Sequence, residues 1–477
     1  MTRNALSIFS AQGINYVLSF VIAVLLIRYL GAQRFGEYSF IMAFLALFGF
    51  VMDIGLNQLI VREASRNREI ARQYLGNFLQ IQFLLSLITY VLLVVSINIF
   101  NSSVLIRYAV YVAGIGLIFG SLMRPFESIL ASFEKMHLNA LINIAKVFFN
   151  SILILLVIFL KKGIIALAWA FVINNLFLLF FSRRICNKHC CKPIFSLDIP
   201  FCRQLIKDAL PFALLVLLLT VQNKIGIVML SKLRGNIEVG WYSVAYKPID
   251  FLLIIASSVS FIFFPLFSRK FKSSLEEGVR ILRILIKCLA AIGIPIALLM
   301  CVFAAKIISL LYGGEYNNSA VSLQIIIWLI PLIYASWIVT TALMSTGRLK
   351  FLIFTNGMIL AFSIIMNLIF IPVYGFIAVS WVTLVAAIIY IIVLLIYIDS
   401  RVHCLDIISL APALLISCLV MMTILFLLHN ALVLFQVIAG IFGYSVTLLA
   451  LRYFPDNEMK AIKELLRLAI PNFRNNR

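Results

Sequence analysis

The sequence carries little charge, and acidic residues are especially scarce. Only 12% of the 477 residues are charged, and only 18 residues are Asp or Glu. A soluble globular protein is about half apolar and about a quarter charged. This composition therefore excludes a soluble enzyme and a disordered chain. Eight cysteines in a chain of this length also do not form the disulfide framework of a small secreted protein.

Motifs for cofactor chemistry are missing as well. The sequence contains no phosphate-binding Gly loop, no nucleotide motif and no catalytic triad, so we expect neither a cofactor nor direct use of ATP. Cys186, His189, Cys190, Cys191 and Cys202 raise a zinc cluster as an alternative. Their spacing matches no standard finger, and membrane topology explains the basic residues around them. We therefore predict no metal site.

Hydrophobic residues make up most of the chain. They account for 64% of it, and the mean hydropathy is +1.12. The apolar stretches run for about 20 residues, the length of a membrane-spanning helix, rather than alternating as in an outer-membrane barrel. We predict an all-α polytopic membrane protein with about fourteen transmembrane helices. They are expected near 5–29, 38–60, 78–99, 109–131, 140–160, 164–181, 209–231, 240–266, 285–303, 320–345, 351–371, 376–397, 409–428 and 432–451.

The formal charge of +21 has an uneven distribution along the predicted loops. With the N-terminus inside, 26 Lys and Arg residues fall in cytoplasmic segments and eight on the opposite side. Short cytoplasmic loops carry such an excess in membrane proteins, so the bias predicts that both termini are cytoplasmic. It also explains the positive charge without nucleic acid as a partner. No cleavable signal peptide is evident.

An internal repeat divides the predicted helices. Three segments of the second half echo segments of the first, in the same order and at offsets of 204 to 213 residues: Gly240–Ser243 with Gly36–Ser39, Leu343–Arg348 with Leu130–Lys135, and Gly375–Trp381 with Gly163–Trp169. A unit of six helices predicts two lobes related by a pseudo-two-fold axis along the membrane normal. The expected parts are an N-terminal lobe at 1–182, a cytoplasmic linker at 183–208, a C-terminal lobe at 209–397, two accessory helices at 398–451 and a cytoplasmic amphipathic tail at 452–477.

Five short motifs carry a family resemblance, which extends over essentially the whole chain. They are Arg28–Gly31, Phe35–Tyr38, Asp53–Leu56, Val61–Ala64 and Leu311–Tyr316. The chain resembles the polysaccharide (O-antigen) flippases of the multidrug/oligosaccharidyl-lipid/polysaccharide exporter superfamily. The resemblance implies alternating access between two six-helix lobes. It also implies movement of an undecaprenyl-pyrophosphate-linked oligosaccharide to the outer leaflet, with polysaccharide polymerase and chain-length proteins as possible partners.

Three alternatives to this function stay open. Lipid II flippases and multidrug exporters share the superfamily plan, so either is a candidate. A membrane-embedded glycan polymerase or transferase belongs to a different class, and the short outward loops disfavour it because such an enzyme needs room outside the bilayer for its acceptor.

Ionisable residues inside predicted membrane helices are costly and by default mark function. We predict that four basic residues bind an anionic substrate: Arg124, Lys146, Lys224 and Lys247. We predict that three acidic residues couple transport to a proton or sodium ion: Asp53, Glu127 and Asp250. The candidates in the first lobe lie in the inner half of the membrane, and those in the second lobe lie in the outer half.

The alternative for these charges is a set of structural salt bridges, since Arg124 with Glu127 and Lys247 with Asp250 are each spaced i,i+3. A further basic residue, Lys287, lies close to a helix end, and we expect it to snorkel to the interface.

Amides are also frequent in the predicted helices, and they fit either a sugar-lined path or interhelical hydrogen bonds. They are Gln12, Asn15, Gln80, Gln82, Asn143, Asn150, Asn174, Asn175, Gln222, Asn223, Gln324, Asn356 and Asn367.

Overall fold

The structure is a computed structural model, and it describes residues 2–52, 57, 60–61, 64–65, 71–100, 102–195, 199–402, 411–455 and 458–461. These residues are almost entirely helical and contain no strand. The helices are α1 (Thr2–Gly49), α3 (Ala71–Ile99), α4 (Val104–Ser132), α5 (Met136–Phe159), α6 (Ile164–His189), α7 (Ile199–Leu233), α8 (Asn236–Ser273), α9 (Leu275–Val302), α10 (Ala304–Tyr312), the 3-10 turn η1 (Gly314–Tyr316), α11 (Ser319–Ile326), α12 (Leu329–Ser345), α13 (Leu349–Tyr374), α14 (Phe376–Val402), α15 (Ala411–Leu427) and α16 (Val433–Ala450).

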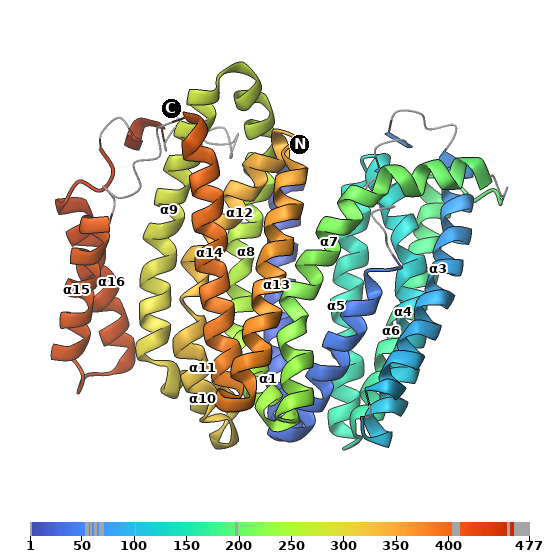
Figure 1. The fold of residues 1–477 in the computed structure, drawn as a ribbon, viewed down its shortest axis with the longest axis horizontal. Helices are drawn as coiled ribbons and strands as arrows, with labels where there is room; N and C mark the ends of the chain where they lie inside the picture. Colours follow the sequence, from blue (N-terminus) through green and yellow to red (C-terminus); the bar gives the residue numbers. More distant parts are fainter. Residues whose placement is uncertain are drawn as a thin grey trace.

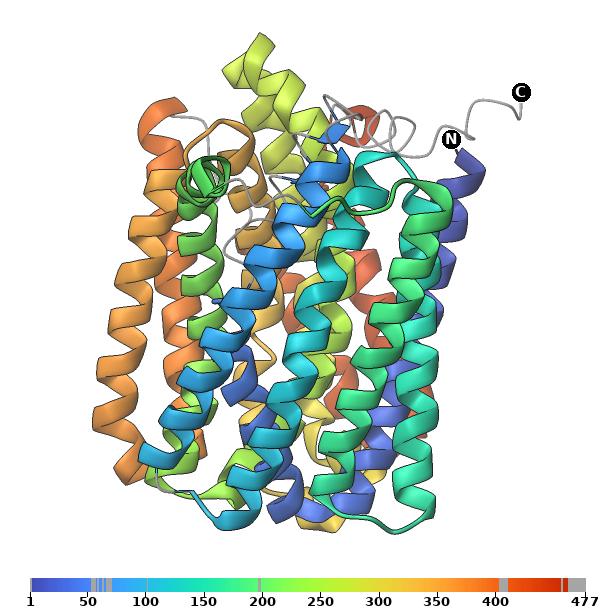
Figure 2. The same ribbon diagram turned by 90° about the vertical axis from the view of Figure 1, so that its right-hand side faces the viewer.

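The described helices confirm a multi-pass membrane protein. Twelve of them are long and apolar enough to cross a membrane, and α15 is a shorter apolar helix. Helix α1 consists of two arms, because Gly31 has a φ of +70° and breaks the helical path. The chain descends along the first arm and returns along the second (Figures 1 and 2). When the two arms are counted separately and α15 is included, the described chain has the fourteen membrane segments that we predicted.

The helices form two groups with a small pair at one side (Figure 1). One group contains α3 to α6 and the second arm of α1, with α4 packed closely on α6 and α3. The other contains α8 to α14, where α12 packs on α8, α9 and α14. Helix α7 leaves the linker and packs on α13 and α1, while α15 and α16 pair with each other beside α9. The six-plus-six-plus-two division and its pseudo-two-fold axis remain predictions.

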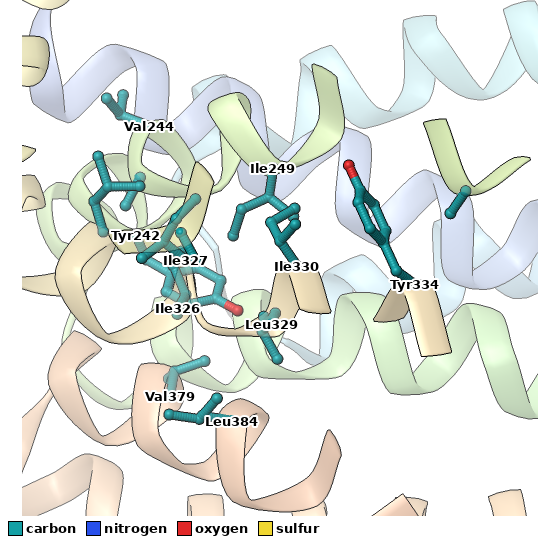
Figure 3. Packing of buried hydrophobic residues seen from close by; sticks show 14 of the residues in the cluster. Tyr242, Val244, Ile249, Ile326, Ile327, Leu329, Ile330, Tyr334, Val379 and Leu384 are labelled. Atoms are coloured by element: carbon teal, nitrogen blue, oxygen red, sulfur yellow. The ribbon is translucent and has the colours of Figure 1, made fainter. Parts of the chain in front are cut away.

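The largest apolar core lies in the second group and extends onto α1. Figure 3 shows residues of α8, α11, α12 and α14 meeting there. Tyr334 is fully buried in this core, and its hydroxyl donates to the carbonyl oxygen of Leu252 over 2.8 Å. In lipid, close packing and such interhelical hydrogen bonds hold helices together, because the lipid tails are as apolar as the helix surfaces.

Helix α9 begins with an N-cap and carries an unexpected ion pair. Ser274 accepts a hydrogen bond from the backbone N–H of Glu277 and so caps the helix. The expectation that Lys287 snorkels is wrong, since its side chain is 8% exposed and its ammonium lies 2.8 Å from the carboxylate of Glu458. The C-terminal segment supplies this carboxylate and also the ring of Tyr453, whose centroid lies 5.7 Å from the ammonium, so the charge is paired within the protein.

Candidate functional site

One end of the molecule, which we call the sealed end, carries the Gly31 turn, α10 and the α13–α14 turn, and it is lowest in Figure 1. Here the second arm of α1 and the start of α8 touch backbone to backbone. A Cβ added to Gly36 would overlap the carbonyl oxygen of Asn236, and one added to Gly240 would overlap that of Ala32. The two glycines that the sequence repeat pairs therefore lie against each other, where only glycine fits.

Hydrogen bonds from α1 reinforce the sealed end. The guanidinium of Arg28 donates to the carbonyl oxygen of Leu311 over 2.7 Å and also to that of Leu310. These carbonyls belong to the last turn of α10, which has no helical donors left for them and favours a nearby cation. The hydroxyl of Tyr316 donates to the carbonyl oxygen of Ile27 over 2.9 Å. Burial raises the pKa of Tyr316, so this hydroxyl stays protonated and remains a donor.

Glu315 joins the two helix groups at the same end. Its carboxylate accepts from the backbone N–H of Ala32, the first residue of the second arm, over 3.3 Å. Its backbone carbonyl accepts from the indole N–H of Trp241 over 3.1 Å. A negative charge is stabilised at a helix N-terminus, and Gly31 leaves room for it because a Cβ there would lie 2.8 Å from the carboxylate.

Glu238 makes a similar cap within the second group. Its carboxylate accepts from the backbone N–H of Phe376 over 2.8 Å, directly after the turn at Gly375, which has a φ of +58°. Arg234 pairs with the same carboxylate at 3.1 Å. The second arm of α1 and helix α14 thus each begin after a glycine with a positive φ. In both, the first backbone N–H donates to a glutamate carboxylate from a distant segment.

A cavity of about 500 Å³ is lined by both arms of α1, by α4, α5 and α6, and by Lys247 of α8. Phe35 and Tyr38 line it beside Gly36. Its charged lining residues are Arg124, Glu127, Lys146 and Lys247, and its other polar lining residues include Ser19, Ser121, Asn150, Ser151, Asn174 and Asn175. Four of the seven predicted charged residues therefore share one cavity, although the sequence placed them at different depths.

Helices α4 and α5 supply three of these four charges. Arg124 and Glu127 lie one turn apart on α4, and Lys146 comes from α5. Glu127 interacts electrostatically with both Lys146 and Arg124. Asn139 at the start of α5 donates to the backbone carbonyl of Glu127 over 2.9 Å, which ties the two helices together at this level. The carboxylate thus interacts with cations from two different helices.

Helix α8 supplies the fourth charge, from the other helix group. Lys247 forms an i,i+3 ion pair with Asp250, the structural alternative raised from the sequence, at 3.5 Å and with side chains 34% and 49% exposed. Lys224 of α7 interacts electrostatically with both of these residues, although it does not line the cavity. Asp250 is also outside the lining, and Asp53 lies outside the described residues. A pair so exposed gains little from its Coulomb energy and leaves Lys247 open to exchange partners.

Two prolines beside these charges escaped our sequence reasoning. Pro125 follows Arg124, and Pro248 follows Lys247, so α4 and α8 each contain the order basic, Pro, apolar, acidic. A helical proline donates no hydrogen bond and leaves the carbonyl four residues earlier without its helical donor. On α4 that carbonyl belongs to Ser121, a cavity residue. The repeated order of residue types was visible in the sequence and would have singled out these two turns.

Metal ligands do not cluster in the described part of the chain. No group of three or more His, Cys, Asp or Glu residues there is arranged to hold a metal ion. The thiol of Cys186 is buried and faces the backbone carbonyl of Cys191 at 3.8 Å.

A comparison with known families decides the relationship that the motifs suggested. The sequence profile of the family described as "Polysaccharide biosynthesis protein" matches residues 1–271, more than half of the chain. The chain belongs to this family. Its members lie in the multidrug/oligosaccharidyl-lipid/polysaccharide exporter superfamily, so the predicted resemblance is confirmed. No curated protein matches the chain by sequence.

Solved structures of the superfamily resemble this family member in fold. A lipid II flippase, MurJ, in an inward closed conformation superposes with a TM-score of 0.77 at 18% identity, covering 94% of this chain and 99% of the flippase. The MATE transporter VcmN of Vibrio cholerae, in a mutant form, has a TM-score of 0.58 at 16% identity and covers 84% and 97%. A superfamily transporter from Pyrococcus furiosus has a TM-score of 0.58 at 15% identity and covers 84% and 95%. Relationships this distant establish the fold, a membrane transporter or flippase fold.

Proposed function

We propose that the protein is a flippase that carries an undecaprenyl-pyrophosphate-linked oligosaccharide, the repeat unit of an O-antigen or similar surface polysaccharide, across a bacterial inner membrane by alternating access. The observation that carries this proposal is a single cavity lined by Arg124, Lys146 and Lys247, the last from the other helix group. We further propose that both termini are cytoplasmic, so that the sealed end faces outward.

The charge of the cavity favours an anionic substrate. Three basic residues and one acidic residue line it, and the basic ones come from both helix groups. A pyrophosphate needs donors where water cannot screen its charge. Arg124 offers a two-pronged guanidinium, and the lysines offer compact point charges. A lipophilic cation, the cargo of a drug exporter, would meet an excess of like charge here.

The polar lining favours a glycan rather than a bare phosphate. Asparagines and serines occupy the walls beside the cations, and neutral amides and hydroxyls are suitable partners for sugar hydroxyls. Lipid II carries the same pyrophosphate with a different glycan, so it is the second candidate substrate, and the whole-chain likeness to a lipid II flippase favours it.

Energy coupling is assigned to the carboxylates near the cations. Glu127 interacts with two cations, and Asp250 pairs with Lys247. Substrate phosphate would compete for Arg124 or Lys247 and free the paired carboxylate to take up a proton or sodium ion. This linkage is reciprocal by thermodynamic necessity. Asp53 is retained as a third coupling candidate and Lys224 as a fourth cation.

The test is translocation in proteoliposomes with fluorescent lipid-linked oligosaccharide and lipid II as parallel substrates. Arg124→Gln, Lys146→Gln and Lys247→Gln should each slow transport of the true substrate by more than about tenfold, because each removes a charge-assisted contact. Lys350→Gln, an exposed lysine outside the cavity, is the matched control. Unchanged transport in all three cavity variants would overturn the proposal. Faster transport of lipid II than of the lipid-linked oligosaccharide would make lipid II the assigned substrate.

Coupling is tested in the same vesicles with imposed proton or sodium gradients. Glu127→Gln and Asp250→Asn should transport at a rate that no longer follows the gradient. If both variants still respond as the wild type does, these carboxylates are structural and coupling lies elsewhere.

A further inference from the structure

Helices α4 and α6 approach each other closely over part of the cavity wall. Gly116 and Gly120 lie one turn apart on α4, the small-xxx-small spacing that lets membrane helices pack tightly. A Cβ on Gly116 would lie 3.2 Å from the Cα atom of Val172, and a Cβ on Gly120 would lie 2.8 Å from the side-chain oxygen of Asn175. The missing side chain at Gly120 is therefore the space that the amide of Asn175 occupies.

Two adjacent asparagines of α6 line the cavity at this point but are held differently. The amide nitrogen of Asn175 donates to the carbonyl oxygen of Phe171 over 2.8 Å, which fixes its orientation. Asn174 is only 4% exposed, and its side-chain oxygen has no hydrogen-bond partner among the described residues. A buried acceptor without a donor costs about 1–3 kcal/mol. A substrate hydroxyl or amide reaching the cavity wall would satisfy it.

Asn150 and Asn175 are each displaced by about one helical turn from a cation of the cavity, and in the same direction. On α4, Gly120, over which Asn175 lies, precedes Arg124 by one turn; on α5, Asn150 follows Lys146 by one turn. The two helices are joined by a short turn and run in opposite directions. Both offsets therefore point the same way, toward the sealed end. At 1.5 Å per residue the amides lie roughly 6 Å deeper than the cations.

We infer that Asn174, together with Asn150 and Asn175, forms a subsite for the sugar residue next to the phosphate. This inference rests on the proposed function, and it assigns the orientation of the substrate. The pyrophosphate lies at the level of Arg124 and Lys146, and the first sugar lies one helical turn closer to the sealed end. The ligand class is a neutral sugar with hydroxyl or acetamido groups, for which an amide offers both a donor and an acceptor.

The test measures binding of two probes to the purified full-length protein in nanodiscs. The probes are undecaprenyl pyrophosphate and the same lipid carrying one N-acetylhexosamine. Asn174→Leu keeps the branched arrangement of the side-chain heavy atoms but removes the amide. It should weaken binding of the sugar-bearing probe about five- to tenfold and leave binding of the bare pyrophosphate lipid unchanged.

Matched variants separate this inference from the proposed function. Asn367→Leu is the control, because Asn367 is equally buried with an unpartnered side-chain oxygen but lies on α13, outside the cavity lining. It should bind both probes as the wild type does. Arg124→Gln should weaken both probes. Asn174→Gln, which keeps an amide, should recover part of the lost affinity, and this guards against a folding defect.

Two results would overturn the assignment: one refutes the sugar subsite alone, and the other refutes the proposed function as well. If Asn174→Leu weakens both probes equally or neither, the sugar does not contact Asn174, while the phosphate site stands through its Arg124→Gln response. If neither probe binds and Arg124→Gln changes nothing, the proposed function itself fails.

Discussion

The sealed end and the cavity share two helices, α1 and α8, but use them in opposite ways. At the sealed end these helices meet through Gly36 and Gly240. Beside this junction, the backbone N–H of Ala32 donates to Glu315 and the hydroxyl of Tyr316 donates to the backbone of α1. In the cavity the same helices contribute Ser19 and Lys247, and the charges there are shared or exposed. The helix junction at the sealed end leaves no room for a side chain at either glycine, whereas the cavity gathers charged and polar side chains.

This difference concerns how firmly each region is held together by hydrogen bonds. Four hydrogen bonds join α1 to residues 310–316 at the sealed end. With each worth about 1–2 kcal/mol net, they together match the order of the roughly 5.5 kcal/mol that converts a 1:99 population into 99:1. We therefore expect any opening of the sealed end to cost free energy of this order.

The most decisive prediction concerns the side of the membrane on which the sealed end lies, and each measurement has only two possible outcomes. Reporter fusions at Arg203 and Arg474 should read cytoplasmic and one at Asn317 periplasmic, because the basic residues are concentrated on the side opposite the sealed end. Arg474 lies outside the described residues. A periplasmic reading at Arg474 would mean that the number of spans is odd.

The largest mutational effect is expected from the glycine junction. Gly36→Ala places a methyl group on the carbonyl oxygen of Asn236, so the sealed end should not close, and transport should fall by more than about tenfold. Hydrogen exchange of the peptide covering 304–318 should accelerate. The matched control is Gly357→Ala on α13, where a Cβ meets nothing within 4 Å. Slow exchange in both variants would show that the junction tolerates a side chain.

A smaller effect is expected from the glutamate that bridges the helix groups. Glu315→Gln keeps the shape but removes the charge that caps the second arm of α1. Charge at a helix N-terminus is worth about 0.3–1 kcal/mol, so exchange at 304–318 should accelerate about two- to fivefold. Glu276→Gln, an exposed glutamate in the first turn of α9, should leave this exchange unchanged. Equal exchange in the two variants would refute a role for Glu315 in closure.

The smallest effect is expected from a single hydroxyl. Tyr316→Phe removes the donor to Ile27 and leaves a carbonyl oxygen unpaired, which should accelerate the same exchange by a few fold. Because burial raises the pKa of Tyr316, the wild-type protein should keep this contact as the pH rises through mildly alkaline values. Tyr374→Phe, an exposed tyrosine at the same end, is the control. A loss of closure in wild type between neutral and mildly alkaline pH would contradict the assignment.

Parts of the candidate site were accessible from the sequence because they follow local rules. The spacing of Lys247 and Asp250 raised an ion pair as the structural alternative, and the structure contains that pair. The same reasoning failed for Lys287, because its partner Glu458 is 171 residues away and no local pattern announces it. Of thirteen amides predicted within membrane helices, Asn150, Asn174 and Asn175 line the cavity. Asn356, by contrast, is buried and donates to the carbonyl of Leu352 on its own helix.

The sequence by itself determined the membrane class, the fourteen segments and the family, because hydropathy, charge bias and short motifs are sums over neighbouring residues. It also paired Gly36 with Gly240 through a repeat. Only the tertiary structure decided that these glycines touch, and that Arg124, Lys146 and Lys247 line one cavity while Lys224 does not. Which face of a membrane helix meets which neighbour depends on rotation and crossing, and nearly uniform apolar segments leave both unspecified until all the helices pack.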